Sequence, residues 1–362
     1  PMRTIAEAAA RDGNNFTWLR HVAALMVLWT HSWSYLDRGF DPLGRLLAGF
    51  DSGRFGVYLF FAISGFLITL TLSRNDALPR YAWHRALRVY PAYAVCLLVS
   101  VFAIGATFTT LPLSDYCAHP RTWSYFTSNW LPISLQWDLP GVFVGHPLTG
   151  LVNGSLWSLG AEIRWYFFFG VLALFGLFRH RRLFTVVAAL LIVDSLRRHG
   201  LPLTHLTTSP AITQLFLLGA LAALWRDVLP LSARILLPLW VIAVACVQTR
   251  FGASLLILAC VYLALCVAYA LPVLKPPKFD YSYGLFLYGA PVQQSLIALF
   301  PGITPLPLFA AAFAFTLPLA PLPSVGERRV ATMSVGALTP ALNLPAPRLL
   351  ETVESARDPM PP

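Results

Sequence analysis

Charged residues are scarce in this chain of 362 residues. Asp, Glu, Lys and Arg make up 12% of it and hydrophobic residues 57%, whereas about 25% of the residues in a soluble domain are charged. No segment is long and polar enough to form a separate soluble core. The sequence therefore excludes a soluble globular protein and predicts an all-α, polytopic membrane protein whose main solvent is the bilayer.

Cysteine patterns that would indicate disulfides or metal binding are also missing. The chain has five cysteines, but no CxxC or zinc-ligand spacing occurs among them, so we predict neither a disulfide framework nor a metal site. Lysine is rare, and most basic residues are arginines scattered between apolar stretches. The net charge of +10 is therefore typical of the positive-inside rule and does not indicate nucleic-acid binding.

Apolar stretches of membrane-spanning length predict about ten transmembrane helices. The predicted spans are residues 18–36, 55–73, 89–110, 155–178, 183–196, 211–226, 231–249, 251–272, 281–300 and 303–320. Most of the Lys and Arg residues between these spans fall on the side that carries the N-terminus. We therefore expect a multi-pass protein with both termini in the cytoplasm.

Three segments organise the chain. Residues 1–15 are predicted to be a cytoplasmic N-terminal segment and residues 16–320 a membrane domain, while the Pro- and Ala-rich residues 321–362 are predicted to be a disordered tail. The longest loop, residues 111–153, falls on the outer side and carries several tryptophans. These could stack on sugar rings or lie in the aromatic belt at the membrane surface.

A histidine inside the first predicted span follows an arginine by eleven positions. Arg20 opens the apolar run and His31 lies within it, so the two stand about 16 Å, or roughly three helical turns, apart. Ionisable groups at membrane depth often mark a transport path or a reaction site, and histidine exchanges protons readily near neutral pH. The alternative is an arginine at a helix end and a histidine with a structural hydrogen bond.

A basic segment on the cytoplasmic side follows the second span. Arg85 and Arg88 are one helical turn apart, so both guanidinium groups can face the same way. Two arginines at the mouth of a membrane domain can hold a phosphate through paired hydrogen bonds. Ordinary positive-inside anchoring explains the same spacing and remains the alternative.

Another ionisable pair enters the fourth predicted span. Glu162 and Arg164 precede a phenylalanine run, and a carboxylate at that depth needs a partner. Positions two apart on a helix point in different directions, so Glu162 is expected to pair with His31 or with an arginine from another helix. A carboxylate bonded to a histidine can orient a general base, although a structural ion pair would look the same in sequence.

Taken together, these segments resemble the acyltransferase-3 family of integral membrane acyltransferases. The resemblance covers roughly residues 15–320 and depends on five motifs that occur in the same order. The motifs are Arg20-x10-His31, Gly56 to Thr69 with Ser64-Gly65-Phe66, Arg85-x-x-Arg88 with Tyr90-Pro91, Ser155-Leu-Trp-Ser-Leu-x-x-Glu162, and Tyr281-Ser-Tyr-Gly-Leu with Pro291. Two features depart from the family. Gly289 follows Tyr288 where many members have a histidine, and the C-terminal end lacks the usual closing motif.

The resemblance implies an O-acyltransferase in the bacterial inner membrane. Such enzymes move an acyl group, here expected to be acetyl, from cytoplasmic acyl-CoA to a hydroxyl of a surface or exported glycan such as lipopolysaccharide. His31 matches the family's essential intramembrane histidine, and Glu162 matches its acidic residue, so both are predicted to be catalytic. Arg20, Arg85 and Arg88 match essential arginines and are predicted to bind acyl-CoA. The expected partners are acyl-CoA, a glycan or lipid-linked saccharide and the bilayer, without nucleic acid or metal.

In the predicted mechanism, Arg85 and Arg88 hold the CoA phosphates and the pantetheine arm carries the thioester to His31. That histidine deprotonates the acceptor hydroxyl and Glu162 orients it, while a covalent acyl-histidine is the competing route. A proton-coupled transporter or glycan flippase is the alternative function, with His31, Glu162 and Arg164 as its proton path. The absence of an evident repeat between the two halves of the sequence favours the enzyme.

Overall fold

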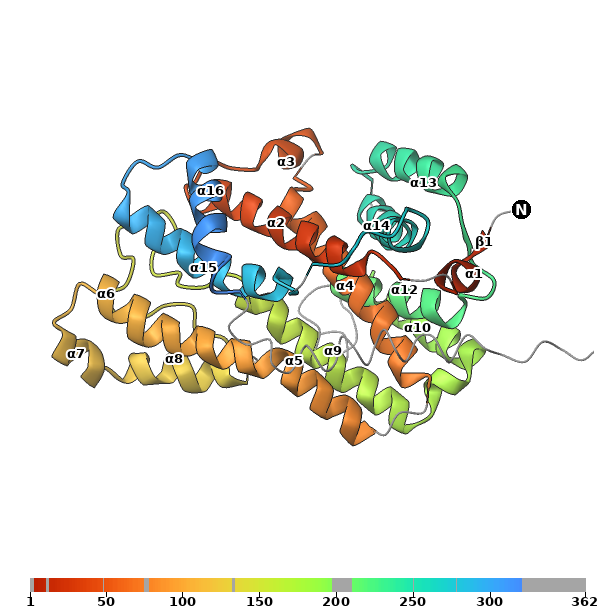
Figure 1. The fold of residues 1–362 in the computed structure, drawn as a ribbon, viewed down its shortest axis with the longest axis horizontal. Coiled ribbons are helices and arrows are strands. Elements are labelled where there is room, and N and C mark those ends of the chain that lie inside the picture. The colour runs from red at the N-terminus through yellow and green to blue at the C-terminus, as the bar shows by residue number, and fades with distance from the viewer. Residues whose placement is uncertain are drawn as a thin grey trace, which may run out of the picture.

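The computed structural model describes residues 3–10, 13–47, 49–74, 78–131, 134–196, 210–249, 251–277 and 279–320. These residues form a mainly helical protein (Figure 1). Within them, the one sheet pairs β1 (Arg3–Thr4) antiparallel with β2 (Pro230–Leu231). The predicted disordered tail, 321–362, lies outside the described residues.

The helices follow the chain in this order. They are α1 Ile5–Ala9, α2 Phe16–Ser34, α3 Pro42–Leu46, α4 Ser52–Leu72, α5 Leu78–Leu98, the π-helix η1 Val99–Gly105, α6 Ala106–Phe108, α7 Leu113–Ala118, α8 Pro120–Trp130, α9 Leu156–Leu174, the 3₁₀-helix η2 Leu177–Arg179, α10 Arg181–Ser195, α12 Pro210–Leu224, α13 Ala233–Ala245, α14 Gly252–Tyr269, α15 Ser282–Leu299 and α16 Pro305–Thr316.

A helix lies in each of the ten ranges that the sequence predicts as spans. Among the described residues, three helices are long and apolar enough to cross a membrane: Ser52–Leu72, Leu78–Phe108 and Gly252–Tyr269. The apolar helices α12, α13 and α16 are shorter. The protein is therefore helical as predicted and has apolar helices of membrane-spanning length, while the number of ten spans stays a prediction.

The third of the ten helices begins earlier than the sequence predicts. The expected span starts at residue 89, but α5 begins at Leu78 and continues through η1 and α6 to Phe108. The polar first turns of α5 hide this start, because hydrophobicity detects only the part of a helix that lies in lipid. As a result, Arg85 and Arg88 lie on the same rigid helix as the apolar span that follows them.

Helix α4 occupies the centre of the helix arrangement, with its most extensive contacts to α12 and α2 and further contacts to α14 (Figure 1). Glycines allow the closest of these approaches. A Cβ at Gly65 would lie 2.3 Å from the carbonyl oxygen of Phe216 on α12, and one at Gly219 would lie 2.5 Å from that of Ala62. Small residues of this kind let membrane helices pack backbone to backbone.

Replacing Gly65 by alanine is expected to destabilise the protein, because the added methyl group has no room beside the Phe216 backbone. Overpacking a close contact costs about 1–3 kcal/mol, so the melting temperature in detergent should fall by several degrees. Gly170→Ala is the matched control, since a Cβ there meets only a Tyr81 ring carbon at 3.8 Å. Equal melting temperatures for the two variants would show that the α4–α12 contact can relax.

The N-terminal segment is docked rather than free. Thr4 and Glu7 form a reciprocal capping box at the start of α1, and Ile5 is fully buried. Strand β1 pairs with β2, which precedes α13. This contact fixes the chain just before α2 and therefore the end of α2 at which Arg20 lies.

Candidate functional site

Helix α2 presents Arg20 and His31 on one face. Eleven residues correspond to three helical turns and about 20°, so the two side chains leave the same side of the helix about 16 Å apart. Arg20 lies in the second turn and His31 in the last turn of α2. His31 is therefore within the predicted apolar run and close to the C-terminal end of α2, which Tyr35 caps.

An aspartate from a distant segment pairs with Arg20. The Arg20 Nη2 lies 2.9 Å from Oδ2 of Asp280, and both side chains are 16% exposed. Burial acts to raise the pKa of Asp280, but the charge of Arg20, then that of Arg88, and a hydrogen bond from Ser282 outweigh it and lower the pKa to about 2. Asp280 therefore remains ionised in the loop before α15 and ties that helix to α2.

His21 reinforces this connection between α2 and α15. Its Nδ1 lies 2.7 Å from the carbonyl oxygen of Thr17, and the backbone N–H of Tyr281 donates to its Nε2 over 3.0 Å. Since a backbone carbonyl accepts and an N–H donates, these contacts fit the tautomer that carries its proton on Nδ1. Neither His21 nor Asp280 is singled out by the sequence analysis. The sequence feature that could have indicated Asp280 is its position directly before the predicted span 281–300.

Arg85 of α5 lies across two tyrosine rings. Its guanidinium carbon is 5.9 Å from the ring centre of Tyr81 and 5.5 Å from that of Tyr166 on α9. The Tyr81 hydroxyl donates to the Tyr166 carbonyl oxygen over 3.1 Å. Arg88, one turn further along α5, interacts electrostatically with both Tyr166 and Asp280. The two arginines predicted to act together therefore lie between α9 and the start of α15.

Glu162 lies with the arginines and not with His31. Its carboxylate accepts hydrogen bonds from Ser64 of α4, over 3.1 Å, and from the Tyr166 hydroxyl. The Gly53 N–H donates to Thr30, the residue before His31, and the eleven residues of α4 from Gly53 to Ser64 cover about 16 Å. The Glu162 carboxylate therefore lies beside Tyr166, whose ring Arg85 also contacts, and about three turns of α4 separate it from the His31 end of α2. Its pairing with an arginine stays a prediction.

Four segments therefore converge on one polar cluster, which we call the arginine cluster. It contains Arg20, Arg85, Arg88, Glu162 and Asp280. It contains three guanidinium groups and two carboxylates, so basic groups outnumber acidic ones and the cluster can bind an anion such as a phosphate. Among the described residues, no group of three or more His, Cys, Asp and Glu side chains could hold a metal ion.

At the other end of α2, His31 stacks on Tyr35. The ring centres are 4.7 Å apart and the ring planes 12° apart. The Tyr35 hydroxyl reaches the segment before α9, where a Cβ on Gly154 would lie only 2.6 Å from it. Asn153 is buried there, and its side-chain amide donates to the Leu287 carbonyl oxygen. The last turn of α2 thus contacts the inner end of the 111–153 loop.

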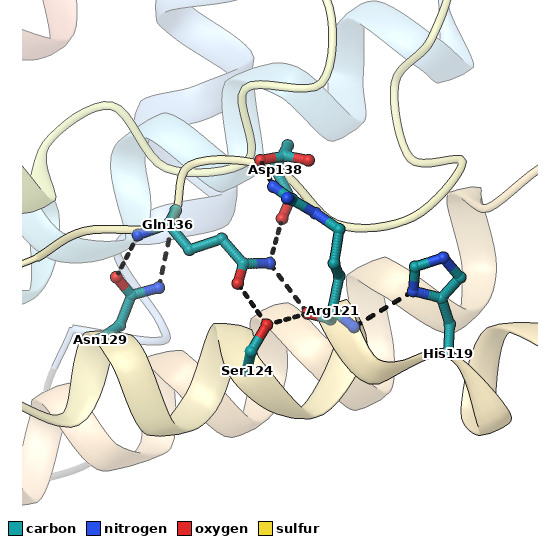
Figure 2. Close-up of polar contacts among 6 residues, drawn as sticks. All are labelled: His119, Arg121, Ser124, Asn129, Gln136 and Asp138. Atoms are coloured by element: carbon teal, nitrogen blue, oxygen red, sulfur yellow. Dashed lines mark hydrogen bonds and ion pairs between the residues drawn. The ribbon is translucent and has the colours of Figure 1, made fainter.

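Polar contacts hold this loop in shape (Figure 2). Arg121 pairs with Asp138 over 2.6 Å. The Gln136 side chain bonds Ser124 and two backbone carbonyl oxygens, and the buried Asn129 exchanges two hydrogen bonds with the Gln136 backbone. These contacts hold the described parts of the loop together, and α8 packs against α5 (Figure 1).

The tryptophans of the loop pack partly on the protein itself. Trp123 contacts the ring of Phe102 and donates its indole N–H to the Cys117 carbonyl oxygen. Trp130 lies against Tyr90, which places the end of α8 beside the middle of α5. These contacts show that α8, within the loop, packs alongside α5.

Changing Asp280 to asparagine is expected to make stability less dependent on pH below 5. The folded-state pKa of about 2 lies below the ordinary value of 3.8, so the ionised carboxylate stabilises the fold fully above pH 3.8. This contribution is lost as the pH falls toward 2. Melting temperatures at pH 5 and pH 3 should therefore differ more for the wild type than for Asp280→Asn. The exposed Asp37→Asn variant is the control, and an equal pH dependence in all three proteins would contradict the assignment.

Comparisons with known proteins give two kinds of match. A family model described as "Acyltransferase domain" matches residues 14–324. The chain is 28% identical over 297 residues to an O-acetyl transferase of Shigella phage Sf6, covering 78% of this chain and 86% of that protein. It is 27% identical over 327 residues to Nodulation protein 10 of Rhizobium leguminosarum bv. viciae, covering 81% and 86%. No solved structure matches it.

Proposed function

The chain belongs to the acyltransferase-3 family and is a membrane O-acyltransferase, and on this basis we propose that it transfers an acetyl group from cytoplasmic acetyl-CoA to a hydroxyl of a surface or exported glycan. The observation that carries the proposal is the geometry of α2. One face of this helix presents Arg20, within the arginine cluster, and His31, three turns away beside the 111–153 loop. An anion site and a proton-accepting group thus lie at the two ends of one helix.

The donor binds at the arginine cluster. CoA carries a diphosphate and a 3′-phosphate, and guanidinium groups bind phosphate oxygens through two parallel hydrogen bonds. Arg85 and Arg88 project from the same side of α5, and Arg20 adds a third positive charge. Asp280 orients Arg20 through their ion pair, and Glu162 and Arg85 both contact the Tyr166 side chain, so Glu162 acts at the donor end of the site.

The thioester reaches His31 through the length of the pantetheine arm. An extended arm is roughly 15–20 Å long, which matches the rise of about 16 Å between Arg20 and His31. With its phosphates at the arginine cluster, acetyl-CoA can thus present its carbonyl carbon beside the last turn of α2. The stacked ring of Tyr35 holds His31 in place for this encounter.

His31 acts as the general base. It accepts the proton of the glycan hydroxyl while the hydroxyl oxygen attacks the thioester carbonyl carbon. The carbon–sulfur bond then breaks, the new ester keeps the acetyl group, and the CoA thiolate takes the proton back from His31. In the competing route, the His31 ring nitrogen is acetylated first and the hydroxyl attacks the acyl-histidine. Both routes balance with acetyl-CoA and glycan hydroxyl as the only reactants.

The proposal includes an orientation in the membrane. Ten helices cross the bacterial inner membrane, both termini are cytoplasmic, the arginine cluster faces the cytoplasm, and the 111–153 loop faces outward. The excess of Lys and Arg on the N-terminal side supports this orientation. In this arrangement the donor and the acceptor enter the helix bundle from opposite sides.

Reconstitution in lipid nanodiscs tests the function. The wild-type protein is mixed with radiolabelled acetyl-CoA and with polysaccharide extracted from a strain that lacks its gene. We expect label to enter the polysaccharide and free CoA to appear in equal amounts. A proton-coupled transporter or flippase would release no CoA, so absence of transfer with properly folded protein would contradict the proposal. Heat-denatured protein is the control for chemical acetylation.

A further inference from the structure

Two successive glutamines on α15, Gln293 and Gln294, are fully buried. Polar groups inside an apolar span can line a cavity or bridge helices, since an apolar helix gains nothing from burying two carboxamides without partners. Buried side-chain amides are normally hydrogen-bonded at both their oxygen and their nitrogen. The contacts of this pair therefore need an explanation.

Each carboxamide is only half satisfied. The Gln293 Nε2 donates to the Leu28 carbonyl oxygen over 2.9 Å and to the Ser32 hydroxyl over 2.7 Å. The Gln294 Oε1 lies 2.8 Å from Nδ1 of His146 in the outer loop. The remaining polar atoms, Gln293 Oε1 and Gln294 Nε2, have no hydrogen-bond partner among the described residues. Exchanging oxygen and nitrogen in either amide would still leave one atom of that amide unpaired.

Unpaired buried polar atoms are costly. Each unpaired atom costs about 1–3 kcal/mol relative to a hydrogen-bonded group. Two of them on adjacent residues therefore destabilise the folded protein considerably. Such groups persist where a ligand completes their hydrogen bonds. The unpaired atoms are neutral, which suits a hydroxyl group better than a phosphate or a carboxylate.

The pair lies beside the last turn of α2. Ser32, which binds Gln293, directly follows His31 in the sequence. His146, which binds Gln294, belongs to the loop whose end at Gly154 contacts Tyr35, and Tyr35 stacks on His31. The same turn of α2 is therefore approached by the glutamines from one side and by the loop from another.

His146 closes this arrangement on the loop side. Its ring stacks on Phe143, with ring centres 4.7 Å apart and planes 23° apart. Its side chain is half-buried, whereas the following residues Leu148 and Thr149 are exposed. The half-buried imidazole thus links the buried Gln294 to the loop that carries these exposed residues.

We propose that Gln293, Gln294 and His146 form the acceptor subsite, which binds hydroxyl groups of the glycan next to His31. This inference rests on the proposed function and adds residues to it. A sugar hydroxyl donates one hydrogen bond and accepts others, so it can satisfy both an unpaired amide N–H and an unpaired amide oxygen. The subsite thereby selects a neutral, hydroxyl-rich acceptor and holds one hydroxyl near the general base.

Kinetics of acetyl transfer in nanodiscs test the subsite, with polysaccharide from the gene-deletion strain as acceptor. For Gln294→Leu and His146→Ala, we expect the KM for polysaccharide to rise at least tenfold. The KM for acetyl-CoA should stay within twofold of wild type. Leu148→Ala, at an exposed position in the same loop, is the matched control and should keep the wild-type KM for both substrates.

Further variants separate substrate binding from a structural role. His146→Gln keeps a hydrogen-bonding group toward Gln294 and should recover part of the affinity for polysaccharide. If Gln294→Leu does not fold, Gln294→Asn replaces it in the same assay. Asparagine keeps both polar atoms of the amide but shortens the side chain by one methylene. An unchanged KM for polysaccharide, or an equal rise of both KM values, would overturn the subsite. Absence of transfer by the wild type would instead overturn the proposed function.

Discussion

Replacing His31 by alanine is expected to abolish acetyl transfer while leaving acetyl-CoA binding unchanged. His31 is the ionisable side chain that α2 presents beside the loop end, and it lies about 16 Å along the helix from Arg20, at the end where we propose that the donor phosphates bind. General-base catalysis contributes about 10²–10⁴-fold to a rate, so the variant should lose at least 100-fold in kcat. Because the arginine cluster is untouched, the Kd for acetyl-CoA should stay within twofold.

Purified variants in nanodiscs check this prediction through the initial rate of transfer and the equilibrium binding of acetyl-CoA. His180→Ala is the matched control, since His180 is an exposed histidine at the N-cap of α10. Transfer by His31→Ala at more than a tenth of the wild-type rate would show that another group accepts the proton. A parallel loss of acetyl-CoA binding would instead point to a structural defect at the end of α2.

Replacing Arg85 or Arg88 by alanine is expected to weaken acetyl-CoA binding by about 10- to 100-fold, since a hydrogen bond to a charged group contributes about 1.5–3 kcal/mol. Loss of Arg85 also leaves the Glu162 carboxylate with less compensating positive charge. Arg85→Lys keeps the charge but not the paired geometry, so its affinity should lie between those of alanine and wild type. The wild-type affinity should also fall as the salt concentration rises.

Calorimetry with acetyl-CoA and with its analogue lacking the 3′-phosphate identifies the phosphate that each arginine holds. The arginine that binds the 3′-phosphate should lose much less affinity for the analogue when it is changed to alanine. Arg54→Ala is the control, because Arg54 lies in the first turn of α4, about 15 Å along the helix from Ser64, which contacts Glu162. Unchanged affinity in both Arg85→Ala and Arg88→Ala would place the CoA phosphates elsewhere.

Much of the helical architecture can be predicted from the sequence, because apolar runs of membrane length and helical periodicity are local properties. Each predicted range contains a helix. The start of α5 at Leu78 could not be predicted in this way, since its first turns are polar. The pairing of β1 with β2 also cannot be predicted from local sequence patterns, because it joins Arg3 to Leu231, which are far apart in the chain.

In the candidate site, too, the sequence identifies individual residues, whereas the contacts between them appear only in the structure. Arg20, His31, Arg85, Arg88 and Glu162 stand out in the sequence as ionisable residues near or within apolar runs, and their roles stay predictions. Which of them lie together depends on the register between helices, and no periodicity within one helix determines that. Hence the Arg20–Asp280 pair, which joins residues 260 positions apart, appears only in the structure. The same holds for the contact between His146 and Gln294.

The mass of surface and exported glycans from a gene-deletion strain tests the central claim most directly. The strain is complemented with the wild-type gene, with the His31→Ala variant or with an empty vector, and the glycans are analysed by mass spectrometry. We predict that acetyl-sized mass increments disappear in the deletion strain and return only with the wild-type gene. Glycans that are identical in all strains, or restored equally by His31→Ala, would contradict a glycan O-acetyltransferase with His31 at its centre.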